Sequence, residues 1–199
     1  MSRRHTDAAI LDAARDCVTD LGVRRTTVVD VARRVGASRM TVYRLFPDAH
    51  SLWSTLLTRE FSTVIAEAEA SATQLPTALE RLVETTVRAA SLIAADPLVR
   101  RVLELDPELL VPYILDRLGQ SQRIAIEHFR RHIEEGHADG SIRPMDEKTV
   151  AYCLQLIVGS FVLATRVTER EAHPAAVNSE LRRLLTMYLR ADAPEATRT

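Results

Sequence analysis

Residues 26–46 read TTVVDVARRVGASRMTVYRLF and are the most informative part of the sequence. Thr27 is a good N-cap for a first short helix, which has Asp30 at its third position. Gly36 can adopt a positive φ where that helix ends, and Ser38 can cap a second short helix. Two short helices joined by a turn of three or four residues that contains glycine are typical of a helix-turn-helix.

The side chains of this stretch divide into an inner and an outer set. Ala32 is small where the two helices must approach closely, and valines supply the apolar contact between them. The outer set lies on the second helix and is polar, so it can donate hydrogen bonds to phosphates or to base edges in a DNA groove. The valines are Val31, Val35 and Val42, and the outer set is Ser38, Arg39, Thr41, Tyr43 and Arg44.

The sequence on both sides is helical in pattern and predicts an all-α protein. Apolar residues recur at helical spacing over about 6–21 and are followed by Gly22, a typical C-cap. After Pro47, Asp48 can cap a long helix. No segment alternates at period two, so we predict no strand. Further helices are expected over about 76–95, after Pro97, over about 119–137, over 147–168 with Asp146 as its cap, and after Pro174, with a proline-punctuated stretch from Pro107.

The charge distribution separates the two ends of the chain. The chain of 199 residues has 46% hydrophobic and 27% charged residues, which is ordinary for a globular protein. Residues 1–47 hold nine Arg against five Asp, a net charge of +4, whereas residues 48–199 hold 17 basic against 22 acidic residues, a net charge of −5. This asymmetry favours a basic head that faces phosphate. We therefore expect a DNA-binding domain over 1–47 and a larger domain over 48–199.

Several other classes of protein are disfavoured. Cys17 and Cys153 lie far apart in apolar helical patterns, which predicts neither a disulfide framework nor a metal or redox motif and fits the reducing cytoplasm. The N-terminal segment has no apolar core of a signal peptide. The most apolar stretch, residues 149–165, is shorter than the roughly 20 residues of a membrane span and is interpreted as a buried helix. Without a glycine-rich phosphate loop or a GxSxG turn, an all-helical enzyme is a weaker alternative, and no cofactor is expected.

The stretch 26–46, with Gly22 before it and Pro47 after it, resembles the N-terminal signature of the TetR family. The resemblance covers about a quarter of the chain. It implies an N-terminal three-helix domain that contains the helix-turn-helix, followed by a helical ligand-binding and dimerisation domain, about nine helices in all. It also implies a repressor that leaves DNA when it binds an effector. The residues then expected at the DNA are Thr27, Ser38, Arg39, Met40, Thr41, Tyr43, Arg44 and His50.

One position departs from the pattern of the family. The family usually has Lys at the start of the fourth helix, followed by an acidic residue, whereas this chain has Ala49 and His50. A phosphate anchor is therefore missing. Arg44, His50 or the arm formed by Arg3 and Arg4 could replace it; otherwise the affinity for DNA is lower and depends less steeply on salt.

The larger domain is expected to form a homodimer and to hold a small hydrophobic effector. One helix-turn-helix reads only a few base pairs, so two copies are needed on a palindromic operator, and the broad apolar faces of the last two helices are the best candidates for the interface. By resemblance, an effector cavity lies among the middle helices, and the abundance of Leu, Val and Ile favours a hydrophobic ligand. The candidate lining residues of this cavity are Trp53, Leu56, Tyr113, Phe129, Tyr152 and Gln155. For each of them, packing in the core or at the dimer interface is the alternative role.

Two alternative functions stay open at this point. A constitutive DNA-binding regulator without an effector would have the same N-terminal motif. His128 and His132 are spaced i, i+4, with Glu135 and His137 nearby. Because this spacing can place metal ligands on one helix face, a metal-responsive sensor is an alternative function. The same run of residues is equally typical of a solvated helix face, so we assign no metal ligand from the sequence.

Overall fold

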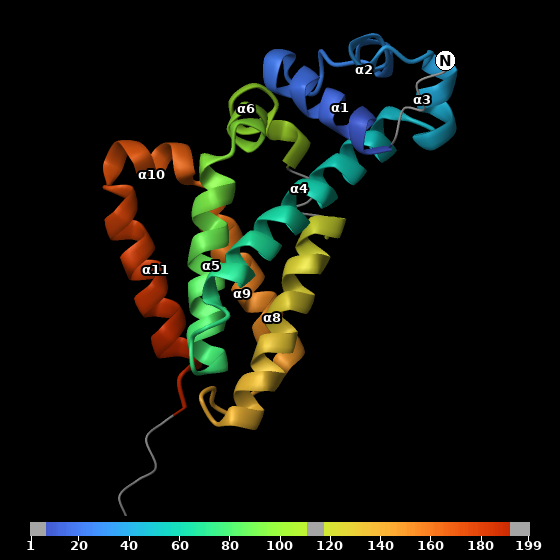
Figure 1. The fold of residues 1–199 in the computed structure, drawn as a ribbon. Coiled ribbons are helices and arrows are strands. Elements are labelled where there is room, and N and C mark those ends of the chain that lie inside the picture. The colour runs from blue at the N-terminus through green and yellow to red at the C-terminus, as the bar shows by residue number, and fades with distance from the viewer. Residues whose placement is uncertain (1–6, 111–117, 192–199) are drawn as a thin grey trace, which may run out of the picture. The chain divides into compact units, whose positions relative to one another are not determined.

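The computed structural model describes residues 7–110 and 118–191, and these residues are almost entirely helical (Figure 1). The described residues form ten α-helices and one 3-10 helix, with a single isolated β-bridge between Ile142 and Arg190. The predicted all-α fold is confirmed. The chain divides into two compact units, one comprising residues 1–63 and 95–121 and the other residues 64–94 and 122–199. The predicted domain boundary after residue 47 stays a prediction.

The first unit is built around one apolar core, to which five helices contribute. The core takes one face of each of the three N-terminal helices, which is why their apolar residues recur every three or four positions. Its fully or almost fully buried side chains include Ile10, Val18, Val31, Val42, Leu52, Leu56 and Leu98. The helices are α1 (Asp7–Leu21), α2 (Val28–Val35), α3 (Arg39–Leu45), the first part of α4 (Ala49–Ala72) and α6 (Pro97–Leu105), which is followed by the 3-10 helix η1 (Pro107–Leu110).

Two helix ends of this unit follow the predicted caps, Gly22 and Asp48, and a third has a cap that was not predicted. Gly22 ends α1 with φ 85° and donates its N–H to the Val18 carbonyl at 2.8 Å. The Asp48 carboxylate accepts the Ser51 N–H at 2.6 Å at the start of α4. Asp96 caps α6, which has Pro97 at its first position. Local capping chemistry therefore sets where these helices begin and end.

The second unit has its own apolar core, which contains residues of α5 (Ala78–Ala95), α8 (Gln120–Asp139), α9 (Glu147–Leu163) and α11 (Pro174–Leu189). α5 and α11 run side by side (Figure 1) and are joined by a hydrogen bond of 3.0 Å from Asn178 to Ser91 and an ion pair of 2.5 Å between Arg182 and Glu84. The Asp146 carboxylate accepts the Thr149 N–H at 2.8 Å, which confirms the predicted cap of α9.

The prediction of one helix over 147–168 was wrong. The structure has α9 and a separate α10 (Thr165–Glu171), which meet at Ala164 with a bend of 62°. Near the break, the Thr165 hydroxyl donates to the Phe161 and Val162 carbonyls at 3.2 and 2.8 Å, and the Ser160 hydroxyl donates to the Ile157 carbonyl at 2.7 Å. Hydroxyls that bond to preceding carbonyls compete with the helical hydrogen bonds and bend helices. These hydroxyl groups, together with the Gly159–Ser160 pair about one turn before the break, account for the bend.

The interpretation of residues 149–165 as a buried helix was also wrong. Val150, Ala151 and Leu154 of α9 are buried, whereas Tyr152 is 45% and Leu156 is 54% exposed. The helix therefore has an apolar face on each side, one in the core and one at the surface of the chain. Among the described residues, no single helix meets the length and hydropathy of a membrane span, although α9 and α10 taken together across their bend do.

Candidate DNA-binding site

α2 begins with a complete capping box. The Thr27 hydroxyl accepts the Asp30 N–H at 3.2 Å, and the Asp30 carboxylate accepts the Thr27 N–H at 3.0 Å and its hydroxyl at 2.6 Å. The pKa of Asp30 is lowered below its usual value of 3.8. The hydrogen bond from the Thr27 hydroxyl is the largest cause, and the one from the Thr27 backbone N–H is the second. The box satisfies N–H groups that a helix start would otherwise leave unpaired.

The turn between α2 and α3 is fixed by Gly36 and Ser38. Gly36 has φ 72° and donates its N–H to the Arg33 carbonyl at 3.2 Å, as expected for a left-handed C-cap. The Ser38 hydroxyl then accepts the Thr41 N–H at 3.1 Å and caps α3. Beneath this cap, Val42 is completely buried against the core of the first unit. One side of α3 is therefore anchored, and the opposite side is presented outward.

The outward side of α3 carries most of the residues predicted at the DNA. Met40 is 71% and Tyr43 is 41% exposed, and Arg39 and Arg44 are exposed beside them. Thr41 is half-buried, and His50 is exposed on the first turn of α4. The arrangement is thus the one that a recognition helix requires, although the eight DNA contacts themselves stay predictions.

The two predicted contacts at helix starts also have a structural role. The hydroxyl of Thr27 is engaged in the capping box, and that of Ser38 is engaged with the N–H and the hydroxyl of Thr41, the latter at 3.0 Å. Each hydroxyl retains one lone pair or one hydrogen for an outside partner. Thr27 and Ser38 are therefore explained by helix capping, whether or not they touch DNA.

The arginines of the first unit separate into paired and unpaired groups. Among the described residues, Arg39 and Arg44 make no hydrogen bond or ion pair, and neither does Arg25, which is exposed in the turn before α2. Arg25 was not selected from the sequence, where nothing separates it from its neighbour Arg24. Most other arginines of the unit are held by carboxylates: Arg15, Arg24, Arg33, Arg34, Arg59 and Arg101. The unpaired guanidinium groups are the ones free to meet phosphate.

The predicted effector residues lie in different parts of the chain. Leu56 is 2% exposed in the core of the first unit, with Trp53 packed against that core. Phe129 is buried in the core of the second unit, whereas Tyr152 is exposed on α9. Gln155 is half-buried on the same helix, and Tyr113 lies outside the described residues. An effector cavity lined by these residues stays a prediction.

The second unit also has a groove of about 470 Å³ between α5 and α11. Arg88, Arg182 and Glu84 lie along it together with serine and asparagine side chains, so it is more polar than the predicted effector site. None of the predicted effector residues that the structure describes lines this groove. Its lining residues are Glu84, Val87, Arg88, Ser91, Leu92, Ala175, Asn178, Ser179 and Arg182.

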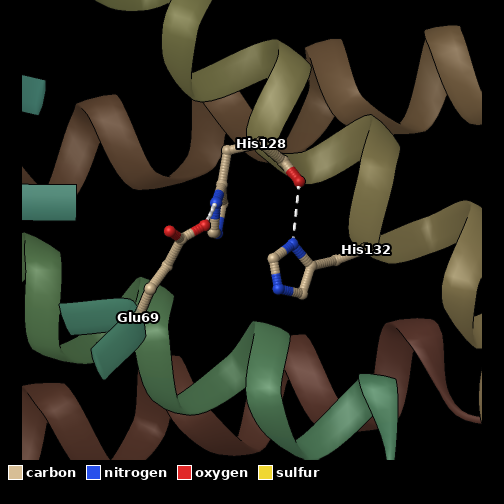
Figure 2. Close-up of side chains that lie close together, drawn as sticks. All are labelled: Glu69, His128 and His132. Atoms are coloured by element: carbon tan, nitrogen blue, oxygen red, sulfur yellow. Dashed lines mark hydrogen bonds and ion pairs between the residues drawn. The ribbon is translucent and has the colours of Figure 1, made fainter. Parts of the chain in front are cut away.

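The histidines of α8 do not form a solvated face. His128 is 8% and His132 is 6% exposed, and Glu69 of α4 lies against them (Figure 2). His137 is engaged elsewhere, with the Arg143 carbonyl at 3.1 Å and the Glu147 carboxylate at 3.3 Å. His128 thus has a carboxylate partner that is 59 residues away in the sequence, and His132 Nδ1 lies 3.0 Å from the His128 carbonyl oxygen.

Comparison with known proteins places these features in one family. A family model described as "Bacterial regulatory proteins, tetR family" matches residues 10–51, which span most of α1, the helix-turn-helix and the start of α4. An uncharacterised HTH-type transcriptional regulator of Mycobacterium bovis is 34% identical over 187 residues, which are 94% of this chain and 96% of that protein.

Two solved structures share the fold at low sequence identity. The regulator FadR from Bacillus subtilis, in complex with stearoyl-CoA, superposes with a TM-score of 0.69 at 17% identity over 92% of this chain and 99% of its own. SmeT, the repressor of the Stenotrophomonas maltophilia multidrug efflux pump SmeDEF, gives a TM-score of 0.68 at 20% identity over 98% of this chain and 96% of its own, and its structure with triclosan is also similar. Together with the extensive match to the mycobacterial regulator, these findings show that the chain is a transcriptional regulator of the TetR family.

Proposed function

We propose that this protein is a ligand-responsive repressor that binds a palindromic operator as a homodimer. The observation that carries the proposal is the outward face of α3, where Arg39, Tyr43 and Arg44 are exposed without partners among the described residues. Unpaired guanidinium groups beside a phenol match the donors that DNA phosphates and guanine edges accept. α3 would lie in the major groove, while Arg25 and His50 would contact the backbone on either side.

The dimer is supported by apolar residues at the surface of α9. Tyr152, Leu156 and Leu163 are all exposed and follow one another at spacings of four and seven residues, which places them on one face of the helix. On α11, Leu184 and Met187 are exposed one turn apart. Faces of this kind are typical of helix pairing between two copies of a chain. A two-fold dimer would present two α3 helices to half-sites about 34–36 Å apart.

The response to a ligand is supported by the similar structures. FadR and SmeT are described with stearoyl-CoA and triclosan, two ligands with large apolar portions. For this chain we propose a hydrophobic effector that binds the second unit. The dimer would have two states, and in one of them the two DNA-binding heads do not fit both half-sites. The effector would bind that state more tightly than the DNA-binding state. Such a differential affinity is what shifts the equilibrium away from DNA.

Selection of binding sites from a random duplex library tests the proposal. The selected DNA is expected to be an inverted repeat, and in fluorescence anisotropy the protein should bind it at least about 10³-fold more tightly than a scrambled duplex at the same salt concentration. Binding without sequence preference would overturn the assignment to operator recognition.

A thermal-shift screen of hydrophobic metabolites separates an effector-responsive repressor from a constitutive regulator. A compound that binds the folded protein raises its melting temperature. We expect such a compound also to release the selected DNA in the anisotropy assay. A compound that raises the melting temperature and leaves DNA binding intact would favour the constitutive regulator.

A further inference from the structure

We propose that Glu69, His128 and His132 form a binding site for a divalent transition-metal ion of the zinc type within the second unit. The site would join the C-terminal part of α4, which carries Glu69, to α8, which carries both histidines. Figure 2 shows the three side chains gathered in the space between the two helices.

The spacing of the three side chains is close to that of a metal site. Each offers one ligand atom, and these atoms all lie within 4.8 Å of one another. The two imidazole rings have centroids 4.3 Å apart, because i, i+4 spacing stacks their positions on one face of α8. Bonds of about 2.0–2.2 Å to zinc place two ligands of a tetrahedral ion about 3.3 Å apart. His128 Nδ1 and a Glu69 oxygen are already 2.8 Å apart, so the adjustment would fall mainly on the side chain of His132.

The hydrogen bonds of the site leave lone pairs where a metal ion needs them. His132 Nδ1 lies 3.0 Å from the His128 carbonyl oxygen, which can only accept, so Nδ1 carries the hydrogen and the lone pair of the neutral ring is on Nε2. His128 Nδ1 lies 2.8 Å from a carboxylate oxygen of Glu69, so an ion bound by both groups would take the place of the hydrogen between them, and the neutral ring would then carry its hydrogen on Nε2. A ring N–H held by a backbone carbonyl, as at His132, is a usual outer contact of a metal-binding histidine.

His128 is deeply buried and uncharged, as a metal-binding histidine must be. His128 Nε2 is buried without a hydrogen-bond partner among the described residues, in a side chain that is only 7% exposed. Burial, followed by the neighbouring His132, lowers the pKa of His128 to about 4, which keeps the ring neutral at physiological pH. The neutral ring can therefore offer its Nδ1 lone pair to an ion that Glu69 also binds.

The donor set selects the class of ion. Two imidazole nitrogens and one carboxylate oxygen match the His₂Glu ligands of open zinc sites, in which water takes the fourth position. Mg²⁺ and Ca²⁺ prefer sites made of oxygen ligands alone, and neither favours imidazole. No cysteine belongs to the cluster, which also disfavours soft monovalent copper.

One charged group opposes the ion. The Arg131 guanidinium forms an ion pair with the same Glu69 carboxylate, and its positive charge would repel a cation there. The Arg131 side chain is 53% exposed and also lies 4.0 Å from Glu135, so it can leave Glu69 without losing every partner. We therefore expect metal binding to displace Arg131 from Glu69.

Titration of the full chain with Zn²⁺ tests the proposal. Protein freed of metal by dialysis against a chelator is titrated in competition with a chromophoric zinc indicator, and Co²⁺ absorption reports the coordination geometry. We expect saturation at one ion per chain, tetrahedral Co²⁺ bands and a higher melting temperature with Zn²⁺. No saturable binding would overturn the proposal.

Four variants locate the ion. Glu69→Gln and His132→Gln should each weaken Zn²⁺ binding at least tenfold, and Arg131→Ala should tighten it several-fold because it removes the opposing charge. His137→Gln is the matched control, since His137 lies on the same helix and is engaged with Arg143 and Glu147; its affinity should equal that of the wild type. Glu69 is partly exposed, so Glu69→Gln is expected to fold, and circular dichroism checks each variant. Zn²⁺ binding that survives both Glu69→Gln and His132→Gln would show that the ion binds elsewhere and would overturn the proposal.

Discussion

The Asp106 carboxylate accepts the backbone N–H of Val23 at 2.7 Å, although 83 residues separate them in the sequence. Asp106 is 3% exposed at the C-cap of α6, and Val23 lies in the turn that leads from α1 to the helix-turn-helix. The same carboxylate lies 3.9 Å from the Arg24 guanidinium. One buried charge thus fixes the turn that precedes the DNA-binding helices.

Replacement of this carboxylate should destabilise the first unit. Asp106→Ala leaves the Val23 N–H without its acceptor, so we expect the free energy of unfolding to fall by about 1–3 kcal/mol. Trp53 is the single tryptophan and packs against the core of this unit, so its fluorescence during urea unfolding reports the change. Glu108→Ala is the control, because Glu108 binds Arg24 at 2.8 Å from an exposed position; its effect should stay within about 0.5 kcal/mol. Equal effects of the two variants would contradict a special role for Asp106.

Two glycines with positive φ should differ in their tolerance of alanine. At Gly36 an added Cβ meets no atom within 4 Å, so Gly36→Ala should cost only the conformational penalty of about 1–2 kcal/mol. At Gly22 the added Cβ would lie 2.9 Å from both the Asp106 carboxylate and Leu105. We expect Gly22→Ala to cost at least about 1 kcal/mol more in the same urea experiment. The reverse order would show that the turn at Gly22 is looser than described.

The capping box predicts a pH dependence of stability. Because the pKa of Asp30 is lower in the folded chain than its usual 3.8, the ionised carboxylate stabilises the fold above that value, and this contribution is lost as the pH falls through the lower folded pKa. Unfolding free energies measured between pH 7 and pH 2.5 should therefore decline more steeply for the wild type than for Asp30→Asn. Parallel curves would mean that the hydrogen bonds from Thr27 do not favour the ionised form.

The surface of α9 predicts the oligomeric state. A charge at Leu156 would have to be buried if this face pairs with a second chain, so Leu156→Asp should convert a dimer into a monomer in sedimentation velocity. Val29→Asp, at an apolar residue of α2 that is 41% exposed, is the matched control and should leave the dimer intact. Dimers of Leu156→Asp as stable as those of the wild type would place the interface elsewhere.

Features set by neighbouring residues were predictable from the sequence. Thr27 with Asp30, Ser38 and Asp146 are N-caps, as predicted, because a capping hydrogen bond reaches only two or three residues along the chain. Gly36 takes the expected left-handed conformation for the same local reason. The outward face of α3 also followed from periodicity alone.

Features that depend on distant contacts were not predictable. The partner of His128 is Glu69, 59 residues away, whereas the sequence suggested the nearby Glu135. The exposed face of α9 escaped prediction because a helix that is apolar on two sides has the same composition as a fully buried one. The bend at Ala164 depends on which carbonyls the hydroxyl of Thr165 reaches, and spacing does not reveal this.

DNA binding by variants of α3 measures whether this helix contacts the operator. The double variant Tyr43→Phe/Arg44→Ala loses one hydroxyl and one unpaired guanidinium from the outward face, and Arg123→Ala loses an exposed arginine of α8 that likewise has no partner among the described residues. Fluorescence anisotropy on the selected duplex, repeated at several salt concentrations, gives the Kd and its salt dependence. We predict that the double variant raises the Kd at least about tenfold and lowers the slope of log K against log salt by about one, while Arg123→Ala matches the wild type. An unchanged Kd and slope for the double variant would contradict the placement of α3 at the DNA.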